Sequence, residues 1–211
     1  MEFDFTALPE QDRYRLLSNF VAPRPIALVT TLSAEGVANA APMSFFNVFS
    51  QEPPILILGI QTRPDGTVKD TVANIDASGS FCVNMVDMAL AEAMTVCGIS
   101  YEPDVDEIAT AGLTMTPATQ IRGGWIAESP CAMECKVAET IRYERRVIIL
   151  GEVVQMHVRD TCLDAAGRYV NPETYQPIAR LHADNYITSD RQFELKAPAQ
   201  PPVGIKRKTP S

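Results

Sequence analysis

The chain has 211 residues, of which 46% are hydrophobic and 21% are charged, and its formal net charge at pH 7 is −8. This length fits one domain whose core is large enough to fold without disulfides or structural zinc. The acidic balance argues against binding to nucleic acid or to an anionic membrane, since both require a basic surface.

The few cysteines and histidines indicate reduced thiols and no metal site. The five cysteines are odd in number and form no C-x-x-C pair, and only His157 and His182 could complete a ligand set. The N-terminal segment is acidic and does not resemble a signal peptide. The longest apolar run, Ile55–Ile60, is too short to span a membrane. We therefore expect a cytoplasmic protein.

The first half of the chain is expected to begin with a helix and to continue mainly as strands. The helix is predicted near Glu10–Leu17, and strands follow over Ile26–Leu32, Val37–Met43 and Ile55–Ile60. The last strand is apolar throughout, which is typical of a strand buried on both faces.

A turn and a helix are predicted next. The segment Arg63–Gly66 reads R-P-D-G, in which proline fixes φ and glycine tolerates a positive φ. Val68, Val72 and Ile75 then share one helical face, and Gly79 is the expected C-cap of that helix.

The second half of the chain is expected to contain further strands, one helix and a long loop. Strands are expected over Phe81–Val86, Met133–Ile141 and Val147–Val158, with Gly151 as a bulge or point of close approach. Asp87 is expected to cap a helix that runs through Cys97. The segment Gly98–Gly124 is expected to be irregular.

Strands separated by turns, with two inserted helices, predict one mainly β, antiparallel barrel with helical insertions over residues 1–197. Residues 198–211 are rich in proline and end in a basic cluster. They are expected to form a tail that is disordered or lies against a partner subunit.

Common catalytic motifs are absent from the sequence. No G-x-G occurs, so the doubly wound dinucleotide fold is excluded, and the P-loop, H-E-x-x-H and G-x-S-x-G patterns are missing as well. A Ser-His-Asp hydrolase is an open alternative, although no local pattern marks a nucleophile. The lack of familiar side-chain chemistry favours a cofactor that carries the reaction.

The segment Arg63–Thr71 gathers groups suited to an anion. It holds two cations and two threonines within nine residues, where a turn becomes a helix. The positive end of the helix dipole and the directed donors suit a phosphate monoester. An ordinary capped turn with solvated charges would look the same.

The segment Asn39–Asn47 combines small residues, hydroxyls and aromatic rings. A flat heteroaromatic ligand needs this mixture, because small side chains let its edge reach the backbone while apolar atoms cover its face. The alternative is a strand end whose phenylalanines fill the core. At least one of Phe45, Phe46 and Phe49 is expected to do so.

Six segments in conserved order resemble the flavin reductase-like, FMN-binding split-barrel family. They are RPIALVTT at 24–31, NAAPMSFFN at 39–47, RPDGTVKDT at 63–71, GSFCVNMV at 79–86, ESPCAMEC at 128–135 and ILGEVV at 149–154. The resemblance covers residues 15–190, and the segment at 63–71 is its strongest signal.

The resemblance implies a homodimer of split β-barrels with one FMN per protomer near the interface, FAD being the less favoured cofactor. It assigns the phosphate and ribityl chain to Arg63, Lys69, Asp70 and Thr71, with Thr67 nearby. Asp70 would orient Lys69 or bind a ribityl hydroxyl. The residues assigned to the isoalloxazine ring are Thr30, Thr31, Ala41, Pro42, Met43, Ser44, Phe45, Phe46 and Asn47, with Cys82 and Asn84 as secondary candidates.

The segment Arg180–Tyr186 departs from the family pattern. Relatives often have glycines before the aromatic residue, where this chain has His182 and Ala183. His182 is a candidate proton donor or gate at the flavin, and an exposed structural histidine is the alternative.

The activity implied by the resemblance is hydride transfer from NADH or NADPH to flavin N5, followed by electron transfer to an acceptor such as a monooxygenase component. Two alternatives belong to other functional classes. One is a flavoredoxin-like electron carrier that does not use nicotinamide. The other is a small-ligand-binding barrel without flavin chemistry.

Overall fold

The computed structural model describes residues 1–196, so the predicted tail at 198–211 lies outside the described residues. Seven strands form the main sheet in the order β3-β2-β6-β9-β10-β5-β4, and every neighbouring pair is antiparallel. Their bounds are β2 Ala27–Leu32, β3 Ala38–Met43, β4 Phe46–Gln51, β5 Pro54–Gln61, β6 Ser80–Met85, β9 Cys131–Tyr143 and β10 Arg146–Val158. The predicted mainly β, antiparallel fold is confirmed.

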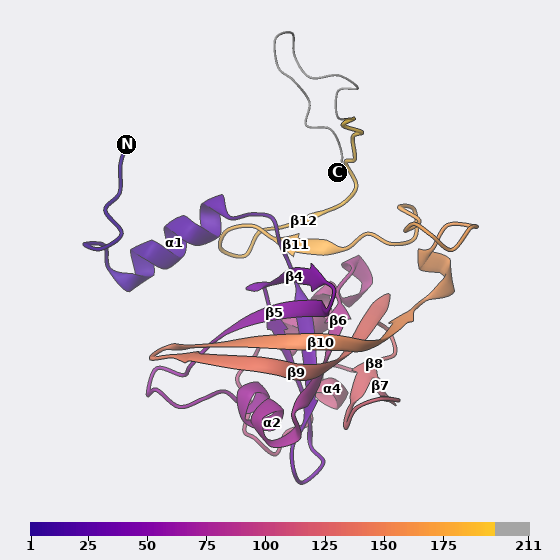
Figure 1. The fold of residues 1–211 in the computed structure, drawn as a ribbon, viewed down its shortest axis with the longest axis horizontal. Helices are drawn as coiled ribbons and strands as arrows, with labels where there is room; N and C mark the ends of the chain where they lie inside the picture. The colour runs from indigo at the N-terminus through magenta and orange to yellow at the C-terminus, as the bar shows by residue number, and fades with distance from the viewer. Residues whose placement is uncertain (197–211) are drawn as a thin grey trace, which may run out of the picture.

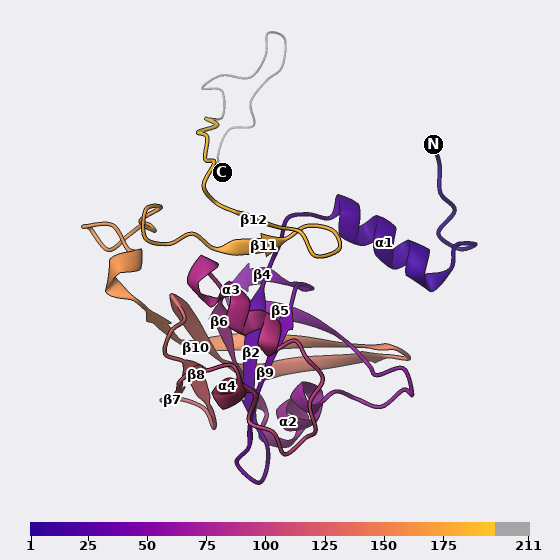
Figure 2. The ribbon, with the colours of Figure 1, turned by 180° about the vertical axis from the view of Figure 1, so that it is seen from behind.

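Smaller elements surround this sheet (Figures 1 and 2). The other strands are β1 Arg24–Pro25, β7 Met115–Pro117, β8 Gly124–Ile126, β11 Ile178–Arg180 and β12 Tyr186–Thr188. The helices are α1 Glu10–Phe20, α2 Asp70–Ser78, α3 Ala91–Val96 and α4 Glu107–Thr110, with 3₁₀ turns η1 Met88–Leu90 and η2 Asp160–Cys162. Within residues 1–196, no helix has the length and apolar character needed to cross a membrane.

The main sheet curls so that its edge strand β3 contacts β5, the neighbour of the other edge strand β4. The two edge strands follow one another in the chain, and the short link between them contains Phe45. The amide of Gly59 on β5 donates a hydrogen bond of 2.8 Å to the carbonyl of Phe45. A Cβ on Gly59 would lie 3.2 Å from the Cβ of Phe45, so the absence of a side chain permits this close approach. The result is a split β-barrel.

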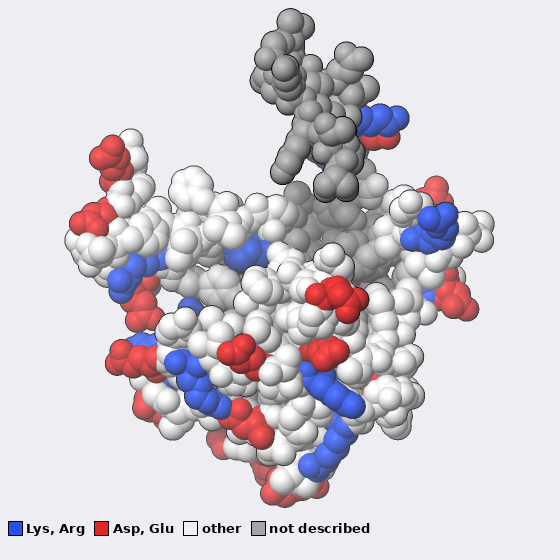
Figure 3. Space-filling model, in the orientation of Figure 1, with Lys and Arg blue, Asp and Glu red and all other residues white. Residues whose placement is uncertain are grey.

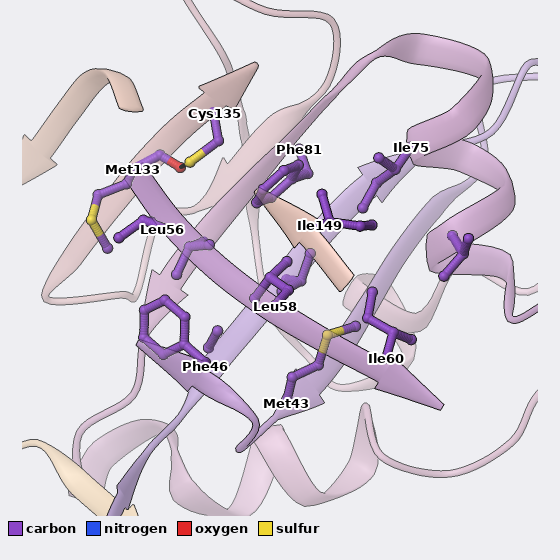
Figure 4. Packing of buried hydrophobic residues seen from close by; sticks show 14 of the residues in the cluster. Met43, Phe46, Leu56, Leu58, Ile60, Ile75, Phe81, Met133, Cys135 and Ile149 are labelled. Carbon is purple, nitrogen blue, oxygen red and sulfur yellow. Dashed lines mark hydrogen bonds between the residues drawn. The ribbon is translucent and has the colours of Figure 1, made fainter. Parts of the chain in front are cut away.

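Alternating side chains fill the interior of the barrel (Figure 4). Leu56, Leu58 and Ile60 point inward from β5 and pack in one buried cluster with Phe81 and Ile149. Burying an aliphatic or aromatic side chain of this size stabilises the fold by about 1.5–3 kcal/mol. Spacing of two residues along each strand therefore determines which side chains form the core.

Strand β10 shifts its register against β9 between Leu150 and Gly151. A Cβ on Gly151 would lie 2.4 Å from Cζ of Phe81, far inside van der Waals contact. The predicted bulge and close approach at Gly151 are confirmed, and the ring of Phe81 is the group that requires glycine there.

Two expectations about secondary structure were wrong. The segment Gly98–Gly124 contains α4, which Asp106 caps by accepting the amide N–H of Ala109, and it contains β7, which pairs with β8. Strand β5 is not fully buried on both faces, since Ile57 is half-buried on the face outside the closed barrel. An apolar run alone does not show which face the barrel encloses.

A buried carboxylate connects three parts of the fold. Glu134 on β9 has a fully buried side chain and accepts hydrogen bonds from the amides of Thr119 (2.8 Å) and Gln120 (2.7 Å). Its Oε1 lies 2.7 Å from Nε2 of His157 on β10, and the His157 ring stacks on Trp125. Burial alone would raise the pKa of Glu134, but the hydrogen bonds from Thr119, His157 and Gln120 together hold it below its usual range.

Glu134→Gln is expected to destabilise the protein at pH 7 by about 1–3 kcal/mol, since the amide cannot accept all these hydrogen bonds. A pKa lowered by folding contributes stability above the unfolded pKa and loses it as pH falls. The difference from wild type should therefore shrink at acidic pH. Urea unfolding from pH 3 to pH 7 measures it, because the loss occurs below the usual carboxyl pKa of 4.5, and exposed Glu139→Gln on the same strand is the control. Equal, pH-independent stabilities would contradict this role.

Candidate functional site

A cavity of about 740 Å³ lies where the end of β5, the start of α2, strand β3 and the segment after α3 meet. Of the residues assigned to the phosphate and ribityl chain, it brings together Arg63, Lys69, Asp70 and Thr71. This volume is within the usual range for small-molecule sites.

A tight turn leads from β5 into this cavity. The amide of Arg63 donates to the carbonyl of Thr67 (2.8 Å), and the amide of Gly66 donates to the carbonyl of Arg63 (2.9 Å). Gly66 has a φ of 87°, a left-handed conformation that glycine adopts without strain. The R-P-D-G segment thus forms the predicted turn.

The N-terminus of α2 carries no side-chain cap. Lys69 is its N-cap residue, with an extended backbone and an exposed side chain. The hydroxyl of Thr71, the second residue of α2, accepts a hydrogen bond of 3.1 Å from Nδ2 of Asn39 and keeps its own proton to donate. The first amides of a helix have no intrahelical acceptor, so this end presents directed donors beside a cation.

Asp70 pairs with Arg63 rather than with Lys69. The distance from Nη2 of Arg63 to Oδ2 of Asp70 is 2.7 Å, and Nη1 of Arg63 donates to the carbonyl of Val68. Asp70 therefore holds the guanidinium at the cavity wall. The structure shows Asp70 paired with Arg63 instead of orienting Lys69, and the alternative that Asp70 binds a ribityl hydroxyl stays a prediction.

Thr62 is a cavity residue that the sequence motifs did not identify. Its side chain is buried, it lines the cavity, and within residues 1–196 its Oγ1 has no hydrogen-bond partner. Buried hydroxyls are almost always hydrogen-bonded, so an unpaired one beside a cavity indicates a polar ligand. The signal available in the sequence was the polar Gln61-Thr62-Arg63 that ends an otherwise apolar strand.

Two further cations reach the cavity from distant parts of the chain. Arg145 comes from the β9–β10 hairpin and lies 3.9 Å from Glu10, and Arg180 comes from β11 and pairs with Asp184 at 3.1 Å. No local motif marks either residue. Figure 3 shows acidic and basic side chains interspersed over one face of the protein. The cavity, by contrast, is lined by Arg63, Lys69, Arg145 and Arg180.

Some of the residues assigned to the isoalloxazine ring line one or both of two adjoining cavities. Ala41 and Pro42 line the main cavity. Pro42, Met43 and Ser44 line an adjoining cavity of about 270 Å³. The two cavities share Pro42 and Arg180, among other residues.

The threonines assigned to the site are engaged elsewhere. The hydroxyl of Thr30 donates to the carbonyl of Gly124 (2.6 Å), and that of Thr31 accepts from Nδ2 of Asn74 (3.1 Å). The exposed Thr67 donates to Asp65 within the turn. None of the three lines the cavities described above, so their role at a ligand stays a prediction.

The aromatic and amide candidates also lie away from the cavities. Phe46 is in the barrel core, and Phe45 packs edge-on against Tyr14 of α1, with ring centroids 6.1 Å apart. Asn47 is exposed and accepts the amide of Val48. The buried secondary candidates are accounted for by the fold: Cys82 lies within β6, and Asn84 bonds to Leu28, Thr30 and Ile126.

The departure at Arg180–Tyr186 lies in the turn between β11 and β12. Ala183 has a φ of 47°, a left-handed conformation in which glycine is unstrained. Its carbonyl accepts from Arg180, whose Nη1 also donates to the Tyr186 hydroxyl at 2.7 Å. His182 is exposed on this turn and lines neither cavity, so its proposed catalytic role stays a prediction.

Comparisons with known proteins agree with this geometry. The chain matches the flavin reductase like domain over residues 20–178. An uncharacterized protein of Aquifex aeolicus (strain VF5) is 37% identical over 93% of this chain and 100% of its own. The structure of 2-nitrobenzoate 2-nitroreductase NbaA from Pseudomonas fluorescens is 34% identical, with a TM-score of 0.87 over 97% of this chain and 100% of that one. Nitrilotriacetate monooxygenase component B from Bacillus cereus is 31% identical, with a TM-score of 0.87 over 92% and 98%.

The family model spans most of the chain, and the antiparallel split barrel is the architecture that the sequence resemblance predicted. The chain belongs to the flavin reductase-like family of split-barrel flavoproteins.

Proposed function

We propose that this protein binds FMN in the main cavity and works as an oxidoreductase that takes electrons from NADH or NADPH and passes them to an acceptor. The observation that carries the proposal is the donor set at the start of α2. The uncapped helix end, Lys69, Arg63 and the unpaired Thr62 hydroxyl all border one cavity.

The residues present fit a phosphate-bearing flavin. Lys69 and the first amides of α2 supply charge and directed donors for a phosphate monoester, while Asp70 holds Arg63 in place. Thr62 and Thr71 can donate to phosphate or ribityl oxygens. Ala41 and Pro42 are small enough to let a flat ring approach the edge strand β3.

FMN, when bound, supplies the redox chemistry that side chains lack. The protein's contribution is to bind and orient the ligand and to exclude water from it. Two relatives suggest acceptors of different kinds, since one is named as a reductase of 2-nitrobenzoate and the other as a monooxygenase component. Five buried free cysteines support the proposed cytoplasmic location, where thiols stay reduced.

The activity is tested by an anaerobic visible spectrum of the protein reconstituted with FMN and mixed with NADH or NADPH. Rapid loss of the oxidised-flavin absorbance is expected. A flavoprotein that resists both nucleotides but bleaches with dithionite would be an electron carrier instead. A protein that binds neither FMN nor FAD would contradict the proposal altogether.

Arg63→Ala combined with Lys69→Ala is expected to weaken FMN binding by about 30-fold or more, because two charge-assisted contacts to phosphate are lost. Riboflavin, which has no phosphate, should lose less than about threefold. Fluorescence titration measures both affinities. Lys136→Ala combined with Arg168→Ala removes the same charge from exposed positions outside the cavity and serves as control. Equal losses for the two ligands would refute the phosphate assignment.

We also propose a homodimer, on the basis of apolar surface outside the barrel. Helix α1 projects from the barrel in both views (Figures 1 and 2), and Leu17 and Phe20 are 49% and 81% exposed. Phe49 on edge strand β4 is 70% exposed. An 11-residue helix has little stability without packing, and clustered exposed apolar side chains mark association sites.

Light scattering at micromolar concentration is expected to give twice the chain mass of 23.1 kDa. Leu17→Glu combined with Phe20→Glu should shift the protein to monomer, since two charges would be buried in the interface. A wild-type monomer, or an unchanged dimer in the double variant, would contradict the assignment of α1 to the interface.

A further inference from the structure

The cavity wall contains a carboxyl group that the phosphate and ring assignments do not use. Glu107 is the first residue of α4, is half-buried and lines the main cavity. Its Oε2 accepts a hydrogen bond of 2.7 Å from the amide of Ala40 on β3. The neighbouring residue Asn39 donates to the Thr71 hydroxyl at 3.1 Å. The Glu107 carboxyl and the start of α2 are thus held by adjacent residues of one strand.

This position places a carboxyl close to the point proposed for the phosphate. Burial and, to a smaller extent, the charges of Asp70 and Asp106 raise the pKa of Glu107 to about 7, against the opposing hydrogen bond from Ala40. Glu107 and the first residues of α2, Asp70 and Thr71, line the same cavity, so a charge bound at the start of α2 shares that cavity with Glu107. Near neutral pH the carboxyl is therefore divided between its neutral and ionised forms.

Other charged groups around the cavity do not neutralise Glu107. Within residues 1–196, Arg63 pairs with Asp70, Arg180 with Asp184 and Arg145 approaches Glu10, and none of them pairs with Glu107. The ionisable groups that act on Glu107 or line its cavity are Asp70, Asp106, Cys97, Tyr101, Arg63, Lys69, Arg145 and Arg180. Burial, together with the Glu107 charge, raises the pKa of Cys97 to about 11, so this thiol stays neutral.

We propose that Glu107 couples the binding of a phosphate-bearing ligand in this cavity to the uptake of one proton from solvent. Through this coupling Glu107 determines the specificity of the cavity for the phosphate group. Ionised Glu107 repels a phosphate dianion, whereas protonated Glu107 removes the repulsion and adds an O–H donor to the cavity wall. The inference rests on the proposed function, because the cavity must be the flavin site.

Calorimetric titration of the full-length protein with FMN at pH 7.5, in two buffers of different ionisation enthalpy, counts the protons taken up. We expect about half a proton or more per FMN, since a nearby dianion raises the carboxyl pKa. Riboflavin should give a clearly smaller uptake. The FMN dissociation constant should rise about sixfold between pH 6.5 and 8.5, as a one-unit increase in the pKa of Glu107 on binding requires.

Glu107→Gln should remove the proton uptake and flatten this pH dependence, while Glu102→Gln, an exposed carboxylate in the same segment, should behave as wild type. If the wild-type protein binds FMN without taking up protons, the inference is overturned and the proposed function is not. This result needs no variant. Unchanged uptake in Glu107→Gln overturns the inference too. Failure to bind FMN, FAD or riboflavin overturns the proposed function together with the inference.

Discussion

Closure of the antiparallel sheet is the constraint on which the other features depend. The hydrogen bond from Gly59 to Phe45 joins β5 to the link between the two edge strands, and Gly151 lets Phe81 pack across the interior. Closure brings β3 beside the start of α2, although 26 residues of sequence separate Met43 from Asp70. The cavity exists because these two segments meet.

The electrostatics of the cavity contrast with those of the whole chain. The protein is acidic, yet Arg63, Lys69, Arg145 and Arg180 converge on one cavity from separate elements. Two carboxylates accompany them, with different consequences. Asp70 is paired and fixes a guanidinium, whereas the Glu107 carboxyl accepts, among the described residues, only the backbone amide of Ala40, and burial makes its ionisation costly. Partner geometry, rather than residue type, determines the chemistry of each carboxylate.

Patterns among neighbouring residues predicted the parts of the fold and site that depend on the backbone geometry of those same residues. The R-P-D-G turn, the C-cap at Gly79 with a φ of 68° and the bulge at Gly151 follow from glycine and proline geometry. Arg63, Lys69 and Thr71 are close in sequence, so their common location required only that turn and helix. The sequence resemblance assigned Thr30 and Phe46 to the isoalloxazine ring. In the structure the Thr30 hydroxyl donates to the carbonyl of Gly124, and Phe46 lies in the barrel core.

The sequence by itself determined the mainly β class, the family and the turn and helix start that carry Arg63, Lys69 and Thr71, since strand alternation, turn residues and a compact motif depend on neighbouring residues. Only the tertiary structure decided that Thr62 is buried with no hydrogen-bond partner among residues 1–196, that Arg145 and Arg180 reach the cavity and that Glu107 lines the same cavity as the start of α2. Those facts depend on which distant segments meet when the barrel closes. No local pattern encodes burial or pairing between segments separated by 30 or more residues.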